Sequence, residues 1–136
     1  MLDVSKRLTV IIAVVGSREY PKKYEVIAEL NTLLKTAISK NRRLHIVSGG
    51  ADGVDTWAYD WALENQVMIT VIPAEWNLFR KPAGYLRNED IWNMASAGIA
   101  FWDGKSPGTQ HSFKLAEKQF KTIRIIRSDE IDDLPW

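Results

Sequence analysis

Three glycine-rich segments of the chain share the residue types that bind phosphate groups. They are Gly16-Ser17-Arg18, Ser48-Gly49-Gly50-Ala51-Asp52-Gly53 and Asp103-Gly104-Lys105-Ser106-Pro107-Gly108-Thr109. Glycine lets the backbone approach a ligand closely and leaves amide N–H groups accessible, and a helix that follows adds partial positive charge. Two cations and four hydroxyl groups would complete such an anion site: Arg18, Lys105, Ser17, Ser48, Ser106 and Thr109.

Each of these segments, taken alone, is more typical of an ordinary turn between a strand and a helix. Three of them together, two carrying a cation, favour a ligand that bears phosphate. Neither standard nucleotide fingerprint is present, because no G-x-G-x-x-G follows the first strand and no G-x-x-x-x-G-K-[ST] occurs in the chain. The sequence therefore disfavours P-loop NTPase chemistry.

Four polar residues in or near these segments each have two interpretations. Asp52 and Asp55 open the second predicted helix, where they would cap it or bind ribose hydroxyls. Thr109 would likewise cap its helix or contact the ligand. Arg87 and Asn88 lie early in the third predicted helix, and Arg87 would be solvated or would bind a phosphate bidentately.

The elements that position these residues alternate between two periodicities. Short apolar, β-branched runs predict five strands, of which the first reads as buried on both faces: 8–15, 44–47, 67–72, 99–102 and 123–126. Helical spacing predicts four helices: 24–40, 54–62, 83–96 and 109–121. The residues expected on their inward faces include Ile27, Leu30, Leu34, Ala37, Ile38, Trp57, Trp61, Leu86, Ile91, Phe113, Ala116 and Phe120.

This alternation predicts an α/β fold, a single Rossmann-like three-layer domain over residues 1–136. We expect a parallel five-stranded sheet in the order 3-2-1-4-5 with helices on both faces, a core over 8–126 and a polar acidic tail over 128–136. The switch point of that order lies between strands one and four. Ligands of such sheets bind at the carboxyl ends of the strands, where the glycine-rich segments are.

Composition narrows the classes of function. With 136 residues and a net charge of +1, the chain has no overall basic balance, so nucleic acid is not an expected partner. No apolar run is long enough to span a membrane and there is no cysteine, so we expect a soluble cytoplasmic protein. His45 and His111 lack partners at metal-ligand spacing, so no metal is expected.

The segment with Trp76, Phe79, Arg80 and Lys81 would form either a lid that stacks on a base or a cover over the sheet.

Read in order, five blocks resemble the YspA-type members of the SLOG superfamily, which is named for the SMF/DprA and Lonely Guy proteins. The blocks are GSR (16–18), SGGADGVDTWA (48–58), EW (75–76), AGYLRNEDI (83–91) and FWDGKSPGTQHS (101–112). The resemblance runs from about residue 8 to 126. It implies a Rossmann-like fold, self-association into a dimer or larger homo-oligomer, and a role in binding or sensing nucleotides or ADP-ribose-like derivatives.

The resemblance leaves catalysis open. The Lonely Guy phosphoribohydrolases carry PGGxGTxxE and an earlier arginine. Here Pro107-Gly108-Thr109 keeps part of that motif, Arg87 could match the arginine, and Ser112 stands at the glutamate position. Glycosidic cleavage needs a carboxylate near the anomeric carbon, which serine cannot supply.

Three functions therefore follow in order of preference. The first is binding of a nucleotide-type ligand without turnover. The second is a phosphoribohydrolase-type glycosidase with Arg87 on the phosphate and Asp52, Asp55 or Asp103 as the carboxylate. The third is a nucleic-acid-binding module that uses Arg18, Arg42, Arg43 and exposed tryptophans.

Overall fold

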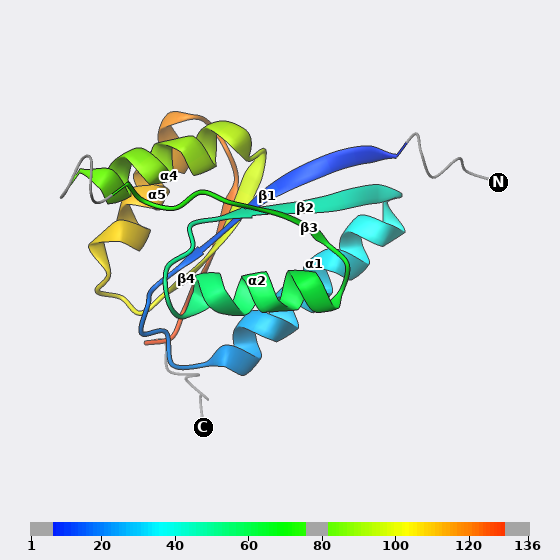
Figure 1. Ribbon diagram of the computed structural model, residues 1–136, viewed down its shortest axis with the longest axis horizontal. Coiled ribbons are helices and arrows are strands. Elements are labelled where there is room, and N and C mark those ends of the chain that lie inside the picture. Colours follow the sequence, from blue (N-terminus) through cyan, green and yellow to red (C-terminus); the bar gives the residue numbers. More distant parts are fainter. Residues whose placement is uncertain (1–6, 76–81, 130–136) are drawn as a thin grey trace, which may run out of the picture.

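The computed structural model of the chain describes residues 7–75 and 82–129, and Figure 1 shows the arrangement of the elements. In these ranges the elements follow one another as β1 (Leu8–Gly16), α1 (Lys23–Ser39), β2 (Arg42–Ser48), α2 (Val54–Glu64), β3 (Met68–Val71), α4 (Ala83–Met94), β4 (Ala97–Trp102), α5 (Pro107–Lys118) and β5 (Ile123–Arg127). The five strands form one sheet in the order β3-β2-β1-β4-β5, and every neighbouring pair is parallel. The predicted α/β fold and strand order are confirmed.

The helices cover the two faces of the sheet in pairs. On one face α1 and α2 pack against β1 side chains such as Val14 and bury Leu30 and Trp61. On the other face α4 and α5 pack against the alternate β1 positions, including Ala13, and bury Trp92. Figure 1 shows the sheet between these two helical layers. The alternation of side chains along a strand therefore divides the core into two halves.

The path of the chain creates a crevice beside β1. α1 leaves the carboxyl end of β1 for one face of the sheet, whereas α5 leaves the carboxyl end of the neighbouring β4 for the other face. Connections that diverge in this way leave space at the strand ends, which is where ligands of open α/β sheets bind.

The first strand is buried on both faces only in its second half. Ile12 is the first β1 residue to pair with β4, whereas pairing with β2 already begins at Leu8. The start of β1 therefore has a neighbour on one side only, and Leu8 is 63% exposed. Uniform burial over 8–15 was therefore wrong for the first residues of that run.

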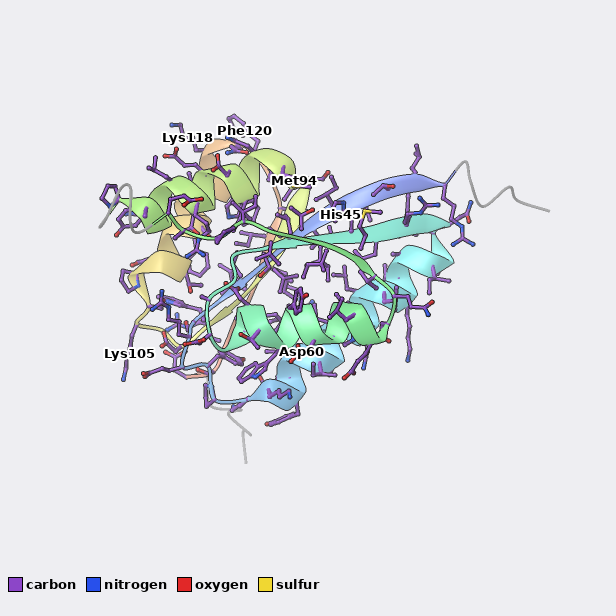
Figure 2. All side chains as sticks on the ribbon, viewed as in Figure 1. His45, Asp60, Met94, Lys105, Lys118 and Phe120 are labelled. Atoms are coloured by element: carbon purple, nitrogen blue, oxygen red, sulfur yellow. The ribbon has the colours of Figure 1, made fainter. Side chains whose placement is uncertain are left out.

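Three of the expected inward residues point outward. Ile38 is 59% exposed, Leu86 40% and Phe120 97%. In α1 the buried residues are Val26, Leu30 and Ala37. The predicted Ile27 and Leu34 pack against the same core as partly buried side chains. α5 ends at Lys118, and Phe120 has a left-handed φ of 54°, which turns its ring away from the sheet (Figure 2). None of the helices in ranges 7–75 and 82–129 is long and apolar enough to cross a membrane.

Gly16 joins the strand end to the helical layer. A Cβ at this position would lie 2.6 Å from Cγ2 and 2.7 Å from Cβ of Val54, the fully buried first residue of α2. We predict that Gly16→Ala lowers the free energy of unfolding by about 1–3 kcal/mol, the usual cost of overfilling a core. Urea denaturation measures the change.

Gly108→Ala is the matched control, because a Cβ at Gly108 meets nothing within 4 Å. Its free energy of unfolding should stay the same or rise by up to about 1 kcal/mol, since alanine restricts the unfolded chain. Equal stability of Gly16→Ala and the wild-type protein would contradict the packing role of Gly16.

Candidate functional site

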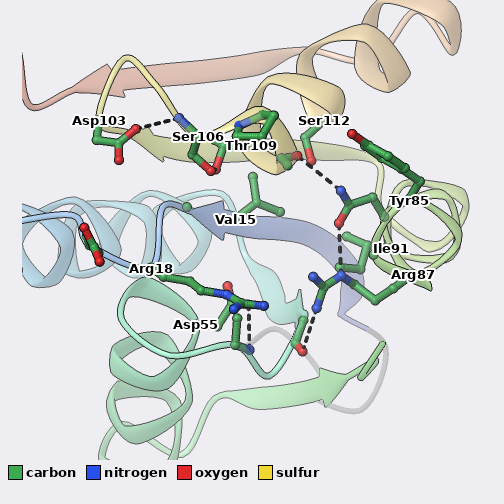
Figure 3. Close-up of a pocket in the computed structure, with 18 residues that line it drawn as sticks. Val15, Arg18, Asp55, Tyr85, Arg87, Ile91, Asp103, Ser106, Thr109 and Ser112 are labelled. Atoms are coloured by element: carbon green, nitrogen blue, oxygen red, sulfur yellow. Dashed lines mark hydrogen bonds between the residues drawn. The ribbon is translucent and has the colours of Figure 1, made fainter. Parts of the chain in front are cut away.

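A cavity of about 470 Å³ lies in the predicted crevice. Its wall combines residues from the end of β1 and the loop after it, the loop after β2, the loop between β4 and α5, and helices α2, α4 and α5 (Figure 3). The lining residues are Val15, Gly16, Arg18, Glu19, Gly49, Ala51, Asp55, Gly84, Tyr85, Arg87, Asn88, Ile91, Asp103, Ser106, Pro107, Gly108, Thr109 and Ser112.

Most of the sequence-predicted site residues lie in this wall. Those brought together are Gly16, Arg18, Gly49, Asp55, Arg87, Asn88, Asp103, Ser106, Gly108 and Thr109. Those outside the wall are Ser17, Ser48, Gly50, Asp52, Gly104 and Lys105. Segments that are up to about ninety residues apart in the sequence therefore meet at one place.

Two of the predicted hydroxyl donors are used inside the protein. Ser17 and Ser48 are each 1% exposed. The Ser17 hydroxyl oxygen accepts the backbone N–H of Asp103 at 3.1 Å, and Ser48 Oγ lies 2.9 Å from the carbonyl oxygen of Val14. These serines position the strand ends rather than facing the cavity.

Lys105 is turned away from the cavity by the carboxylate that precedes it. Asp103 Oδ1 accepts the backbone N–H groups of Lys105 at 2.9 Å and Ser106 at 2.8 Å, which folds the loop into a tight turn. Partial burial acts to raise the pKa of Asp103, but the bonds from Ser106, Lys105 and Ser17 together lower it. Figure 2 shows Lys105 at the periphery, so the predicted second cation does not reach this pocket.

The start of α5 lies closer to the strand end than predicted. Ser106 is the N-cap and Pro107 occupies the first turn, so Thr109 lies within the helix and is not its cap. The N–H groups of Gly108 and Thr109 belong to the first turn, where a helix provides no carbonyl acceptor. The positive end of this helix therefore contributes to the cavity wall.

Arg87 reaches from α4 to the loop after β2. Its Nη1 donates to the carbonyl oxygen of Gly49 at 3.2 Å, and its Nε donates to Asn88 Oδ1 at 3.1 Å. A Cβ on Gly49 would overlap the Arg87 guanidinium and would lie 2.9 Å from Asp55 Oδ2. Only glycine therefore lets the guanidinium of α4 and the carboxyl of α2 approach the same loop.

Asp55 forms the buried wall opposite that guanidinium. Its carboxyl group lies 3.0 Å from Ser48 Oγ and accepts the Ala51 N–H at 3.0 Å. Burial raises the pKa of Asp55, while the bonds from Ala51 and Ser48 and the charge of Arg87 oppose that rise. Asp55 lies inside helix α2, whose N-cap is Gly53, so Asp55 does not cap this helix. The exposed Asp52 lies outside both the helix and the cavity wall.

Two guanidinium groups share the cavity. Burial lowers the pKa of Arg87, the nearby positive charge of Arg18 lowers it further, and Asp55 partly offsets both effects. Arg18 makes no hydrogen bond or ion pair with the residues in ranges 7–75 and 82–129. Figure 3 shows both side chains reaching into the pocket from different elements. A bound anion would relieve the repulsion between them.

Asn88 connects this cation to an imidazole ring. Because Asn88 Oδ1 accepts from Arg87, its Nδ2 is the donor, and it lies 3.2 Å from the Gly108 carbonyl oxygen and 3.3 Å from His111 Nδ1. This assignment makes His111 Nδ1 an acceptor and leaves the ring proton on Nε2. Burial lowers the pKa of His111, Lys114 lowers it further, and Glu89 opposes both.

Sequence reasoning missed several lining residues, notably Tyr85, Glu19 and Ile91. Tyr85 lies three residues before Asn88 on α4, and Ile91 lies about one turn after Arg87 and Asn88, so the helical period could have found both. Ser112, noted only at the family's glutamate position, also lines the pocket. Its buried hydroxyl has no hydrogen-bond partner in the part of the chain that the structure describes.

Two other predictions concern the lid and a metal. The predicted lid residues Trp76, Phe79, Arg80 and Lys81 lie outside the described residues. Within 7–75 and 82–129, no cluster of three or more His, Cys, Asp or Glu side chains could hold a metal ion.

Comparisons with known proteins agree with this architecture. A family model described as the YspA, cpYpsA-related SLOG family matches residues 10–79. A comparison with curated proteins found no match. Among solved structures, the chain is similar to DNA processing protein A from Helicobacter pylori, solved in a study of its single-stranded DNA binding mode. The identity is 23% and the TM-score 0.67, over 95% of this chain and 70% of that chain, which establishes a shared fold.

The hydrogen bond from Asn88 predicts how His111 titrates. Burial lowers the pKa values of both His111 and His45, so we expect both NMR titration midpoints below the usual value of about 6.5. Since the unfolded chain then binds protons more readily, these groups lower the free energy of unfolding as the pH falls below about 6.5.

The chain contains two histidines, so His111→Gln assigns the two NMR signals without ambiguity. Nitrogen-15 shifts of His111 should report a neutral ring protonated at Nε2. A midpoint at or above 6.5, or a proton on Nδ1, would contradict the arrangement around Asn88.

Proposed function

Because the chain belongs to the YspA, cpYpsA-related SLOG family, we propose that it binds a nucleotide or an ADP-ribose-like derivative in the 470 Å³ cavity. The observation that carries the proposal is the approach of Arg18 and Arg87 within one wall that also contains the first turn of α5. Two cations and a helix N-terminus together suit a phosphate or diphosphate group. The volume lies within the range of small-molecule sites.

The carboxyl groups of the wall are compatible with that anion. Asp103 Oδ1 already accepts two N–H groups of its own loop, and burial raises the pKa of Asp55, which favours the neutral form of that carboxyl group. Carboxyl oxygens also accept hydrogen bonds from ribose hydroxyls. The phosphate is therefore assigned to the arginines and to the α5 amides, and the sugar to the carboxyl-bearing part of the wall.

The cations proposed for nucleic acid do not form one surface. Arg42 and Arg43 begin β2, whereas Arg18 follows the carboxyl end of the parallel strand β1, so they lie at opposite edges of the sheet. Single-stranded DNA binding was studied for the Helicobacter pylori protein. In this chain, the separation of the arginines favours a compact ligand over an extended strand.

We predict that Arg18→Gln and Arg87→Gln each weaken the binding of ADP-ribose about tenfold to a hundredfold. The reason is the loss of charged hydrogen bonds, each of which contributes about 1.5–3 kcal/mol. Isothermal titration calorimetry measures the affinities, and Arg43→Gln, an exposed arginine at the opposite edge, is the matched control. Gly49→Ala should resemble Arg87→Gln because a Cβ there displaces the guanidinium.

Adenosine, which has no phosphate, should bind the wild-type protein far more weakly than ADP-ribose. A ligand at about 100 times its Kd should stabilise the protein by about 2.7 kcal/mol in a thermal-shift panel of mononucleotides, dinucleotides and ADP-ribose. The proposal fails if no phosphate-bearing compound stabilises the protein at millimolar concentration, or if both arginine variants bind as the wild-type protein does.

A second candidate function is cleavage of an N-glycosidic bond. The observation that favours it is the buried Asp55 carboxyl, which has a raised pKa and lies in the wall beside Arg87. A carboxyl group with a raised pKa suits acid–base chemistry at a glycosidic bond. Of the three predicted carboxylates, Asp52 is outside the wall and Asp103 is held by its own loop.

If the protein is a glycosidase, Asp55→Asn should reduce the release of free base from AMP at least a hundredfold. Asp52→Asn should leave the rate within about twofold of the wild-type value. Chromatography of the reaction mixture measures the free base, and circular dichroism checks that both variants fold. No free base above the uncatalysed level, or equal rates for Asp55→Asn and wild type, would exclude this function for Asp55.

A further inference from the structure

A second cavity of about 320 Å³ adjoins the first one. It is lined by Tyr85, Pro107, Gln110, His111 and Lys114, and it shares Tyr85 and Pro107 with the larger cavity. The second cavity lies between the first turn of α4 and the first two turns of α5. The two cavities therefore border the same two side chains, Tyr85 and Pro107.

Tyr85 presents an aromatic surface at the boundary. Its side chain is 47% exposed, and its ring meets the His111 ring edge to face, with centroids 4.5 Å apart and an interplanar angle of 75°. This contact fixes the orientation of the tyrosine ring while leaving much of it uncovered. An exposed and oriented aromatic ring is suited to stacking on a nucleobase.

The polar groups of the second cavity suit a neutral heterocycle better than a phosphate. With Nδ1 accepting from Asn88, the neutral His111 ring offers one Nε2–H donor. The Gln110 side chain offers both a donor and an acceptor, the combination that pairs with a base edge. Lys114 is the one full cation among these lining residues, whereas the larger cavity holds two arginines.

We propose that this second cavity is the base subsite of the ligand, with Tyr85 stacking on a planar heteroaromatic base and Gln110 binding the edge of that base. The inference rests on the proposed function, because it assigns the phosphate of the same ligand to Arg18 and Arg87. Asn88 links the two subsites, since it bonds both Arg87 and His111. A ligand that fills both cavities is thus a nucleotide or nucleoside diphosphate derivative rather than a sugar phosphate alone.

The test compares ligands with and without a base. Calorimetry measures the binding of AMP, ADP-ribose and ribose 5-phosphate to the wild-type protein and to Tyr85→Ala, Tyr85→Phe and Gln110→Ala. We expect Tyr85→Ala and Gln110→Ala to weaken AMP or ADP-ribose binding at least tenfold, while ribose 5-phosphate binding stays within twofold. Tyr85→Phe keeps the ring and should bind all three as the wild-type protein does. The control is Tyr59→Ala, because Tyr59 is an exposed tyrosine on α2 that lines neither cavity.

The outcomes separate the two proposals. If base-bearing and base-free compounds bind the wild-type protein equally well, or if both alanine variants bind AMP and ADP-ribose as the wild-type protein does, the base subsite is wrong while the phosphate site stands. An equal loss of affinity for all three compounds in both alanine variants also overturns the base subsite. If none of the three compounds binds the wild-type protein, the proposed function itself is wrong.

Discussion

The contact of the Arg87 guanidinium with the backbone of Gly49 holds the candidate site together. Arg87 comes from the helical layer on one face of the sheet, and Asp55 comes from the layer on the other face. Both side chains converge on Gly49, which follows strand β2 and has no Cβ to keep them apart. The cavity therefore depends on a glycine as much as on its charged residues.

This arrangement also explains how the cation remains available. Arginine has five N–H donors, and among the described residues Arg87 uses Nη1 for Gly49 and Nε for Asn88. The remaining donors are positioned by these two bonds without being consumed by them. Arg18, in contrast, makes no such bond within ranges 7–75 and 82–129, so one arginine is fixed and the other is free to adjust. A pair of this kind suits phosphate groups whose number and spacing vary.

The sequence was sufficient for the strand order and for the place of the cavity, because apolar β-branched runs separated by helical spacing favour a parallel sheet whose strand ends meet at one crevice. The sequence was insufficient where a side chain could bind either a ligand or a neighbouring group of the protein itself. Ser17 and Ser48 look like ligand donors, yet both satisfy buried groups of the strand ends. Lys105 looks like a site cation, but the Asp103 turn directs it outward. Tyr85 could have been found from its i, i+3 spacing to Asn88 on α4, but its edge-to-face contact with His111 required coordinates.

The most direct test of the account is to map ADP-ribose binding on backbone amide NMR signals of the protein. The account predicts that the largest shifts on titration occur at residues 16–19, 49–51, 84–88 and 103–112, where the strand ends and the two cavities lie. Small or absent shifts should be seen at Arg42 and Arg43, at the opposite edge of the sheet. The largest shifts at that opposite edge, or on the outer faces of α1 and α2, would contradict the assignment of the ligand to this crevice.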